Sequence, residues 1–134
     1  MLLHLNATTS AKDTDFTAKL TDVYPDGRSI LLTDGIVRVR FRHTLEKDEL
    51  ITPGQAYAYD IDLGSTSIVF NKGHQIRVTI SSSNSPRFEP NPNTGGPLLP
   101  DPKEKPVMAH QTIFLGGANA SYITLPQIPG AATQ

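Results

Sequence analysis

The chain has 134 residues with 12 basic and 13 acidic side chains, which gives a formal net charge of −1. This length suits one domain, and the balanced charge argues against nucleic acid or an anionic membrane surface as partners, because a basic face usually meets both. The absence of cysteine excludes a disulfide framework, a thiol nucleophile and a thiolate zinc site, and no apolar run approaches the roughly 18 residues of a membrane span.

Apolar and polar residues alternate with a period of two along much of the chain, and sustained helical periodicity is missing. Residues 24–27 read Tyr-Pro-Asp-Gly, a turn signal in which proline presets φ and glycine accepts a positive φ. Asp34-Gly35, Pro53-Gly54 and Lys72-Gly73 are weaker turn signals. We therefore expect seven to nine short strands in an all-β sandwich or jelly roll, with at most one helical turn at 46–50. The expected strands cover residues 3–7, 16–20, 30–33, 37–41, 57–63, 76–80, 113–115 and 123–125.

Residues 84–106 contain seven of the 11 prolines, so this segment cannot form a central strand. It is either a disordered linker or a long ordered loop. Its arginine, its phenylalanine and three asparagines are anchoring groups that favour order against another surface. The chain also opens inside an expected strand with no preceding turn, which suggests a cut through a longer protein.

Two pairs of alternating carboxylates, Asp13/Asp15 and Asp60/Asp62, are the candidate acidic sites. Calcium and some glycosidases use paired carboxylates, but neither pair has the further ligands and the glycine of a calcium loop. Asp60/Asp62 are expected to face solvent, whereas Asp13/Asp15 are expected to fix a loop or to meet another domain. The alternating arginines at 38, 40 and 42 predict a stripe on one strand face. It can bind an anion, although pairing with acidic groups on a neighbouring strand is favoured.

No segment has the Gly-x-Ser-x-Gly pattern that places a hydrolase serine on a strained turn. The four histidines, at 4, 43, 74 and 110, lack the short spacing of metal ligands. His4 is expected to point outward from its strand, and His74 to be a turn residue bonded to backbone. With no tryptophan, an exposed aromatic platform for sugar rings is not expected either.

An ordered series of short motifs resembles the C-terminal domain of the X-Pro dipeptidyl-peptidase and cocaine-esterase-like hydrolases. The resemblance covers nearly the whole chain. Its motifs lie at residues 13–28, 32–38, 52–54, 66–67, 70–78, 81–84, 86–88, 91–95 and 125–129.

The resemblance implies a galactose-binding-like jelly roll, residues 1–134 with a proline-rich loop at 84–106, behind an α/β-hydrolase catalytic domain. The catalytic serine, aspartate and histidine would lie in that other domain, so no catalytic, cofactor-binding or metal-binding residue carries over to this chain. The family's first strand is expected to be missing before Met1, and residues 84–95 resemble its docking loop. The expected interdomain contact comprises Asp13, Asp15, Asn84, Arg87, Phe88, Asn91, Asn93 and Thr94.

The sequence therefore predicts a non-catalytic β-sandwich of a serine hydrolase, of the acyl esterase, acylase or X-Pro dipeptidyl-peptidase type. Its partner would be the catalytic domain, against which it shapes the substrate cleft. An independent carbohydrate-binding module is the alternative function, and a structural domain for homo-oligomer contacts is a third. Substrate and compartment stay open.

Overall fold

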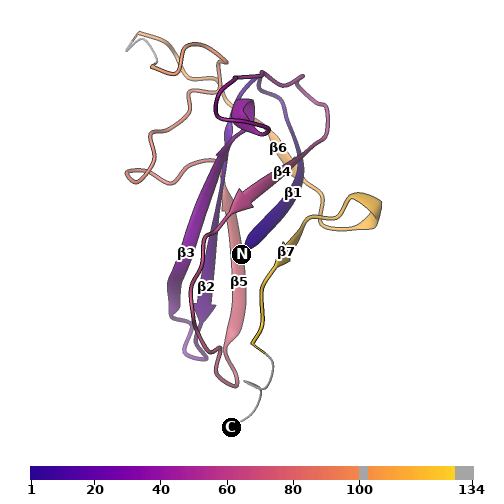
Figure 1. Ribbon diagram of the computed structural model, residues 1–134. Coiled ribbons are helices and arrows are strands. Elements are labelled where there is room, and N and C mark those ends of the chain that lie inside the picture. The colour runs from indigo at the N-terminus through magenta and orange to yellow at the C-terminus, as the bar shows by residue number, and fades with distance from the viewer. Residues whose placement is uncertain (100–102, 129–134) are drawn as a thin grey trace.

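The computed structural model describes residues 1–99 and 103–128, which form a β-sandwich of two antiparallel sheets (Figure 1). None of these residues belongs to a helix long and apolar enough to cross a membrane. The all-β prediction is confirmed, with seven strands in the described part of the chain. Sheet A contains β1 (Leu2–Thr9), β4 (Tyr57–Asp62), β6 (Gln111–Ile113) and β7 (Tyr122–Thr124), and sheet B contains β2 (Asp15–Val23), β3 (Ser29–Arg38) and β5 (Gln75–Ser81).

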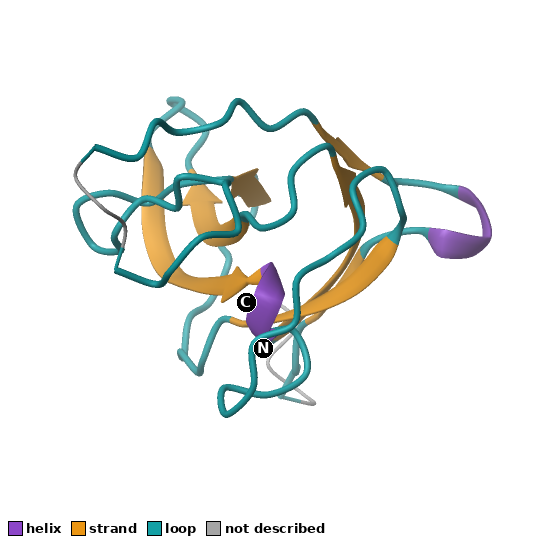
Figure 2. Cartoon of the chain, turned by 90° about the horizontal axis from the view of Figure 1, so that it is seen from above, coloured by secondary structure: helices purple, strands orange, loops and turns teal. Residues whose placement is uncertain are grey.

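Each sheet has one long central strand. In sheet A, β1 pairs with β4 along one side, and with β6 and then β7 along the other. In sheet B, β2 lies between β3 and β5, and it is buried along almost its whole length. The longer loops gather at one end of the sandwich, at the top of Figure 1, and the view from above shows loops around the two layers of strands (Figure 2).

The core lies between the sheets and follows the alternation of the sequence. Leu3, Leu5 and Ala7 of β1 are buried while their neighbours are partly exposed. The rings of Phe16 and Tyr59, one from each sheet, lie 5.2 Å apart at their centroids. Because strands bury every second side chain, this pattern fixes which face of each strand turns inward. The buried apolar cluster contains Leu3, Leu5, Ala7, Phe16, Ala18, Leu20, Val37, Val39, Ile51, Tyr59, Ile61 and Leu63.

Three local predictions for residues 30–42 were wrong. The runs at 30–33 and 37–41 are not separate strands, because β3 continues through Asp34-Gly35 without a turn and ends at Arg38. A short 3-10 turn, η1 (Val39–Phe41), follows it, so the three arginines do not form a stripe on one strand. Residues 46–50 contain no helical turn, which agrees with the expectation of at most one. A second 3-10 turn, η2 (Gly117–Asn119), precedes β7.

The two long edges of the sandwich differ. At one edge β3 lies so close to β4 that a Cβ at Gly35 would meet the backbone oxygen of Asp62, and the Thr33 hydroxyl donates a hydrogen bond to the Leu63 carbonyl. At the other edge, between β5 and β7, a groove of about 200 Å³ remains. The sandwich is therefore closed on one side and open on the other.

Candidate functional site

The candidate site lies at the loop end of the sandwich, where Asp13 precedes β2. The Asp13 side chain is 1% exposed and pairs with Arg40, which is 6% exposed. The Arg40 Nε atom donates to Asp13 Oδ2 at 2.8 Å, and its backbone N–H donates to Asp13 Oδ1 at 3.2 Å. A buried carboxylate needs such a partner because an unpaired charge in the interior is costly.

A second ion pair lies beside the first. Asp15 opens β2 and faces Arg38, the last residue of β3, across the ladder. The Arg38 Nε and Nη2 atoms donate to the two Asp15 oxygens at 2.8 and 3.0 Å, a bidentate geometry. The hydrogen bond to Asp15 raises the pKa of Arg38 above its ordinary value. The favoured prediction, that the arginines pair with acidic groups on a neighbouring strand, is confirmed for Arg38. Arg40 instead pairs with Asp13, which precedes β2, and Arg42 pairs with Glu49 in a loop.

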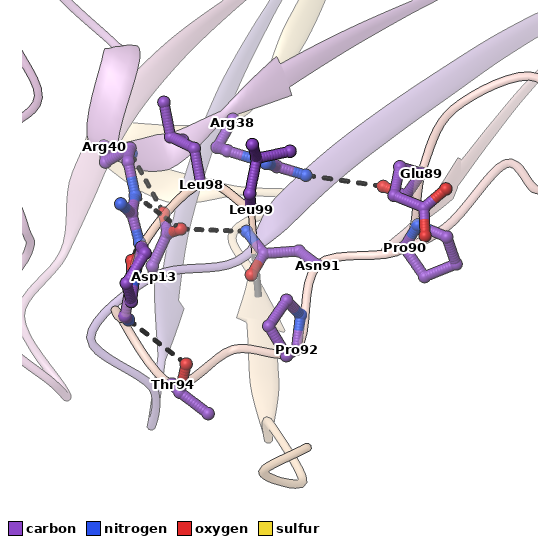
Figure 3. Close-up of a pocket in the computed structure, with 12 residues that line it drawn as sticks. Asp13, Arg38, Arg40, Glu89, Pro90, Asn91, Pro92, Thr94, Leu98 and Leu99 are labelled. Carbon is purple, nitrogen blue, oxygen red and sulfur yellow. Dashed lines mark hydrogen bonds and ion pairs between the residues drawn. The ribbon is translucent and has the colours of Figure 1, made fainter. Parts of the chain in front are cut away.

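Asn91 of the proline-rich loop joins both pairs, and Figure 3 shows its contact with Asp13. Its side-chain Nδ2 donates to Asp13 Oδ2 at 3.0 Å and to Asp15 Oδ1 at 2.9 Å. Its Oδ1 accepts the backbone N–H of Asn93 at 2.9 Å, so the same side chain also shapes the loop. We call Asp13, Asp15, Arg38, Arg40 and Asn91 the anchor cluster.

Further contacts hold the loop on both sides of the anchor cluster. Arg40 Nη2 donates to the Gly96 carbonyl at 2.9 Å, and Arg38 Nη2 to the Glu89 carbonyl at 3.4 Å. The Thr94 hydroxyl accepts the Gly96 N–H at 3.1 Å. Asn93 Nδ2 donates to the carbonyl of residue 107 at 2.9 Å. The described part of the loop is therefore ordered against the sandwich.

The start of the loop is attached separately, through Asp34 of β3. Asn84 Nδ2 donates to Asp34 Oδ2 at 2.7 Å, and the Arg87 guanidinium pairs with the other oxygen of the nearly buried Asp34 carboxylate. The Arg87 side chain itself is largely exposed and lies over the Phe88 ring, 5.4 Å from its centroid.

A cavity of about 140 Å³ lies between the anchor cluster and the loop. Leu98 and Leu99 line it, and both remain exposed to solvent. An ordered loop that carries two exposed leucines is typical of a surface that meets another polypeptide. Asp34, Leu98 and Leu99 were missed by the sequence analysis, although an apolar pair inside a polar, proline-rich segment was a signal for the leucines.

The structure thus brings Asp13, Asp15 and Asn91 into direct contact. The other expected contact residues lie along the same loop: Asn93 and Thr94 beside the anchor cluster, and Asn84, Arg87 and Phe88 at the Asp34 attachment. Within this chain they position the loop. Their expected contact with another domain stays a prediction.

Two histidines pair with aspartates elsewhere. His4 lies on the outer face of sheet A, with its Nδ1 2.6 Å from Asp60 and its ring stacked on Tyr122. His74 is a turn residue, as expected, but its ring also lies 2.9 Å from both oxygens of the buried Asp22, which the sequence did not indicate. Among residues 1–99 and 103–128, no three histidines and carboxylates gather as a metal site would require.

Residues 1–124 match the family described as the X-Pro dipeptidyl-peptidase C-terminal non-catalytic domain. The chain is 49% identical over 124 residues to a cocaine esterase of Rhodococcus sp. (strain MB1 Bresler), an alignment that covers 92% of this chain and 22% of that protein.

Two solved structures are similar to the described fold. One is an α-amino acid ester hydrolase, with a TM-score of 0.84 and 29% identity over 90% of this chain and 21% of that one. The other is an aminopeptidase from a marine sediment archaeon (Thaumarchaeota archaeon), with a TM-score of 0.83 and 28% identity over the same shares of the two chains. The chain spans about a fifth of the length of these relatives.

Proposed function

The chain belongs to the family of X-Pro dipeptidyl-peptidase C-terminal non-catalytic domains, and we propose that it serves a longer serine hydrolase as its C-terminal β-sandwich. In this role it packs on an α/β-hydrolase catalytic domain and helps to wall the substrate cleft. The observation that carries the proposal is the 49% identity with a cocaine esterase over 124 residues, which make up only 22% of that esterase. An acyl esterase, an acylase or an X-Pro dipeptidyl-peptidase is the proposed parent.

The proline-rich loop is the proposed contact surface. Its exposed side chains include Arg87, whose guanidinium also pairs with Asp34, and the leucines Leu98 and Leu99, which can touch a partner. The buried Asp13 and Asp15 set the position of the loop through Asn91. Apolar anchors on a pre-ordered loop lose little conformational freedom on docking, which favours a stable interdomain contact. Such a wall also excludes water from a substrate pocket.

The anchor cluster is suited to fixing the conformation of the proline-rich loop. Asp13 receives hydrogen bonds from Arg40 and Asn91, and Asp15 from Arg38 and Asn91. A substrate that reached either carboxylate would have to displace a guanidinium and an amide. This arrangement supports a structural role for the cluster within the proposed hydrolase.

The proposal is tested by a chimera. In the Rhodococcus cocaine esterase, the C-terminal region aligned with this chain is replaced by residues 1–134, and hydrolysis of 4-nitrophenyl acetate is measured. We expect a soluble, active esterase, whereas the esterase truncated before the same region loses activity. In the chimera, Leu99→Asp should lower activity or the melting temperature. The control Leu45→Asp should not, although Leu45 is as exposed (86% against 89%).

The outcome that contradicts the proposal is activity of the chain by itself. The isolated chain is assayed on activated esters and on X-Pro anilides, and no turnover is expected above the buffer rate. Turnover that a serine-directed inhibitor abolishes would place a reactive centre within these residues. An inactive but folded chimera would also count against the proposal.

A further inference from the structure

Residues 64–73 lie in the connection from β4 of sheet A to β5 of sheet B, and we call this segment the strap. It runs from the end of β4 to the end of the sandwich that lies opposite the proline-rich loop (Figure 1). The structure describes the whole strap, and no residue in it belongs to a strand or to the buried apolar cluster. Ile68 and Val69 are 41% and 68% exposed, and Phe70 is half-buried. The strap therefore contributes little to the core.

A buried pair fastens the strap where it leads into β5. The ring of His74, the residue after the strap, lies 2.9 Å from both oxygens of Asp22 in β2, and both side chains are more than nine-tenths buried. The same ring lies 4.2 Å from the ring of Tyr24, which follows β2, measured between centroids. The His74 backbone N–H donates to the Asn71 carbonyl at 3.0 Å and closes the last turn of the strap. We call Asp22, Tyr24 and His74 the latch.

The strap is fastened at its two ends and not between them. At the β4 end, the Thr33 hydroxyl donates to the Leu63 carbonyl, and the Gly64 N–H donates to Asp62 Oδ1 at 2.7 Å. Among the described residues, no hydrogen bond reaches residues 65–70. Gly64 and Gly73 have φ of +67° and +87°, a region that glycine adopts without strain, so each end has a residue suited to act as a hinge.

The free energy of opening differs between the strap and the latch. Each residue that leaves a single conformation gains about 1–2 kcal/mol of backbone entropy, and an opened strap loses only the partial burial of Ile68 and Phe70. An opening that spread into β5 would also separate His74 from Asp22. Because a buried carboxylate without its partner is costly, the opening should stop at the latch.

We propose that the strap is a lid that opens on Gly64 and Gly73 while both sheets stay folded, and that the latch confines this opening to the strap. Proteins open locally in cooperative units, at a lower free energy than global unfolding. The strap is such a unit, and the turn at Tyr24 on the other side of the latch is not. The proposal rests on contacts within this chain and does not depend on the proposed hydrolase parent.

Limited proteolysis of the full chain with chymotrypsin tests the lid, because cleavage within a folded protein follows the population of the locally open form. Mass spectrometry should show cleavage after Phe70 at least about tenfold faster than after Tyr24. Tyr24 is the internal control, since it is also a half-buried aromatic residue, but its N–H and carbonyl bond to Arg28 and Gly27. Low urea should change the Phe70 rate by less than about twofold, because a local opening exposes little surface.

His74→Gln tests the latch. The opening should then spread, so that Tyr24 is also cleaved and the Phe70 rate rises with urea. His43→Gln is the matched control, because His43 is exposed, and it should behave like the natural chain. Equal cleavage after Phe70 and Tyr24 in the natural chain would overturn the proposal even if His74→Gln did not fold, and so would a folded His74→Gln chain that still resists cleavage after Tyr24. Neither result touches the chimera, which tests the hydrolase role separately.

Discussion

The space between the sheets and the anchor cluster are both buried, but different forces hold them. Leu5, in the core, is 0% exposed and packs within the apolar cluster. The hydrophobic effect that stabilises such packing has no preferred direction. Asp13, in the anchor cluster, is as well buried and depends on directed hydrogen bonds from Arg40 and Asn91. Stability therefore depends on different features in the two regions. The core must be filled by side chains of the right volume, and the anchor cluster must keep each hydrogen-bond partner.

The difference has an energetic consequence. Truncation of a core leucine leaves a cavity and costs about 2–5 kcal/mol, depending on how well the site collapses. Removal of one partner from a buried ion pair leaves the other charge without compensation, which costs about 3–5 kcal/mol. Replacement of both partners by apolar groups is often neutral. The anchor cluster should thus be fragile to single changes and tolerant of paired ones.

The largest expected effect comes from Asp13→Ala. We expect it to lower the free energy of unfolding by about 3–5 kcal/mol, since the buried Arg40 then keeps only the exposed carboxylate of Asp48, 3.6 Å from its Nη1 atom. Urea unfolding followed by circular dichroism measures the change. The double variant Asp13→Leu/Arg40→Met should recover much of the loss.

Asp26→Ala is the control for this variant. Asp26 pairs with Arg28, two residues away and exposed, so its removal should leave the unfolding midpoint unchanged. Two results would contradict the prediction: an unchanged unfolding midpoint in Asp13→Ala, or a double variant no more stable than the single one. Either would mean that the anchor cluster contributes as little to stability as a surface ion pair.

The sequence predicted the core more fully than the anchor cluster, for a physical reason. Alternation along one strand reports which side chains turn inward, so β1, β2, β4 and β5 could be located from local pattern alone. The ion pairs depend on residues that are distant in sequence: Arg40 is 27 residues from Asp13, and Asn91 is 78 residues away. The alternating carboxylates indicated that Asp13 and Asp15 would fix a loop or meet another domain, but not which loop residue would reach them.

The errors of the sequence analysis have the same origin. The alternating arginines looked like one strand face, yet β3 ends at Arg38 and the chain turns in η1, which brings Arg40 to Asp13. His74 lies at a predicted turn, but the pairing of β5 with β2 is what places it beside Asp22. The sheet topology brings such side-chain partners together from distant parts of the sequence, so a local sequence pattern cannot predict them.

A smaller effect is expected from Asn91→Ala, which removes the link between the loop and the two ion pairs. Hydrogen bonds to charged groups contribute about 1.5–3 kcal/mol, so a loss in this range is expected. Because both ion pairs remain, the loss should be local: amide hydrogen exchange should accelerate at residues 84–99, and the protection of β1 and β2 should persist.

Asn119→Ala in the exposed turn η2 is the matched asparagine control, and it should alter neither stability nor exchange in the loop. Faster exchange throughout both sheets in Asn91→Ala would mean that the anchor cluster and the core unfold as one unit. The loop attachment and the core would then form one cooperative unit, not two that unfold separately.

The smallest effect tests the core itself, through Tyr59→Phe. The Tyr59 hydroxyl is buried with no hydrogen-bond partner among the described residues, so its removal should leave the free energy of unfolding unchanged or raise it by up to about 1 kcal/mol. The control Tyr57→Phe should have the opposite sign, because the Tyr57 hydroxyl accepts the Thr52 N–H at 3.1 Å.

The pH dependence of stability gives a second test of the buried Tyr59 hydroxyl. Burial raises the pKa of Tyr59 to about 12, against 10.0 for an ordinary tyrosine. Between these values the unfolded chain releases a proton that the folded chain retains, so the stability of the natural chain falls as pH rises through this window. Urea unfolding at pH 8 and pH 11 should show a smaller fall in Tyr59→Phe than in the natural chain. Equal falls would mean that the Tyr59 hydroxyl reaches water in the folded chain. The interior between the sheets would then not be closed to solvent at this position.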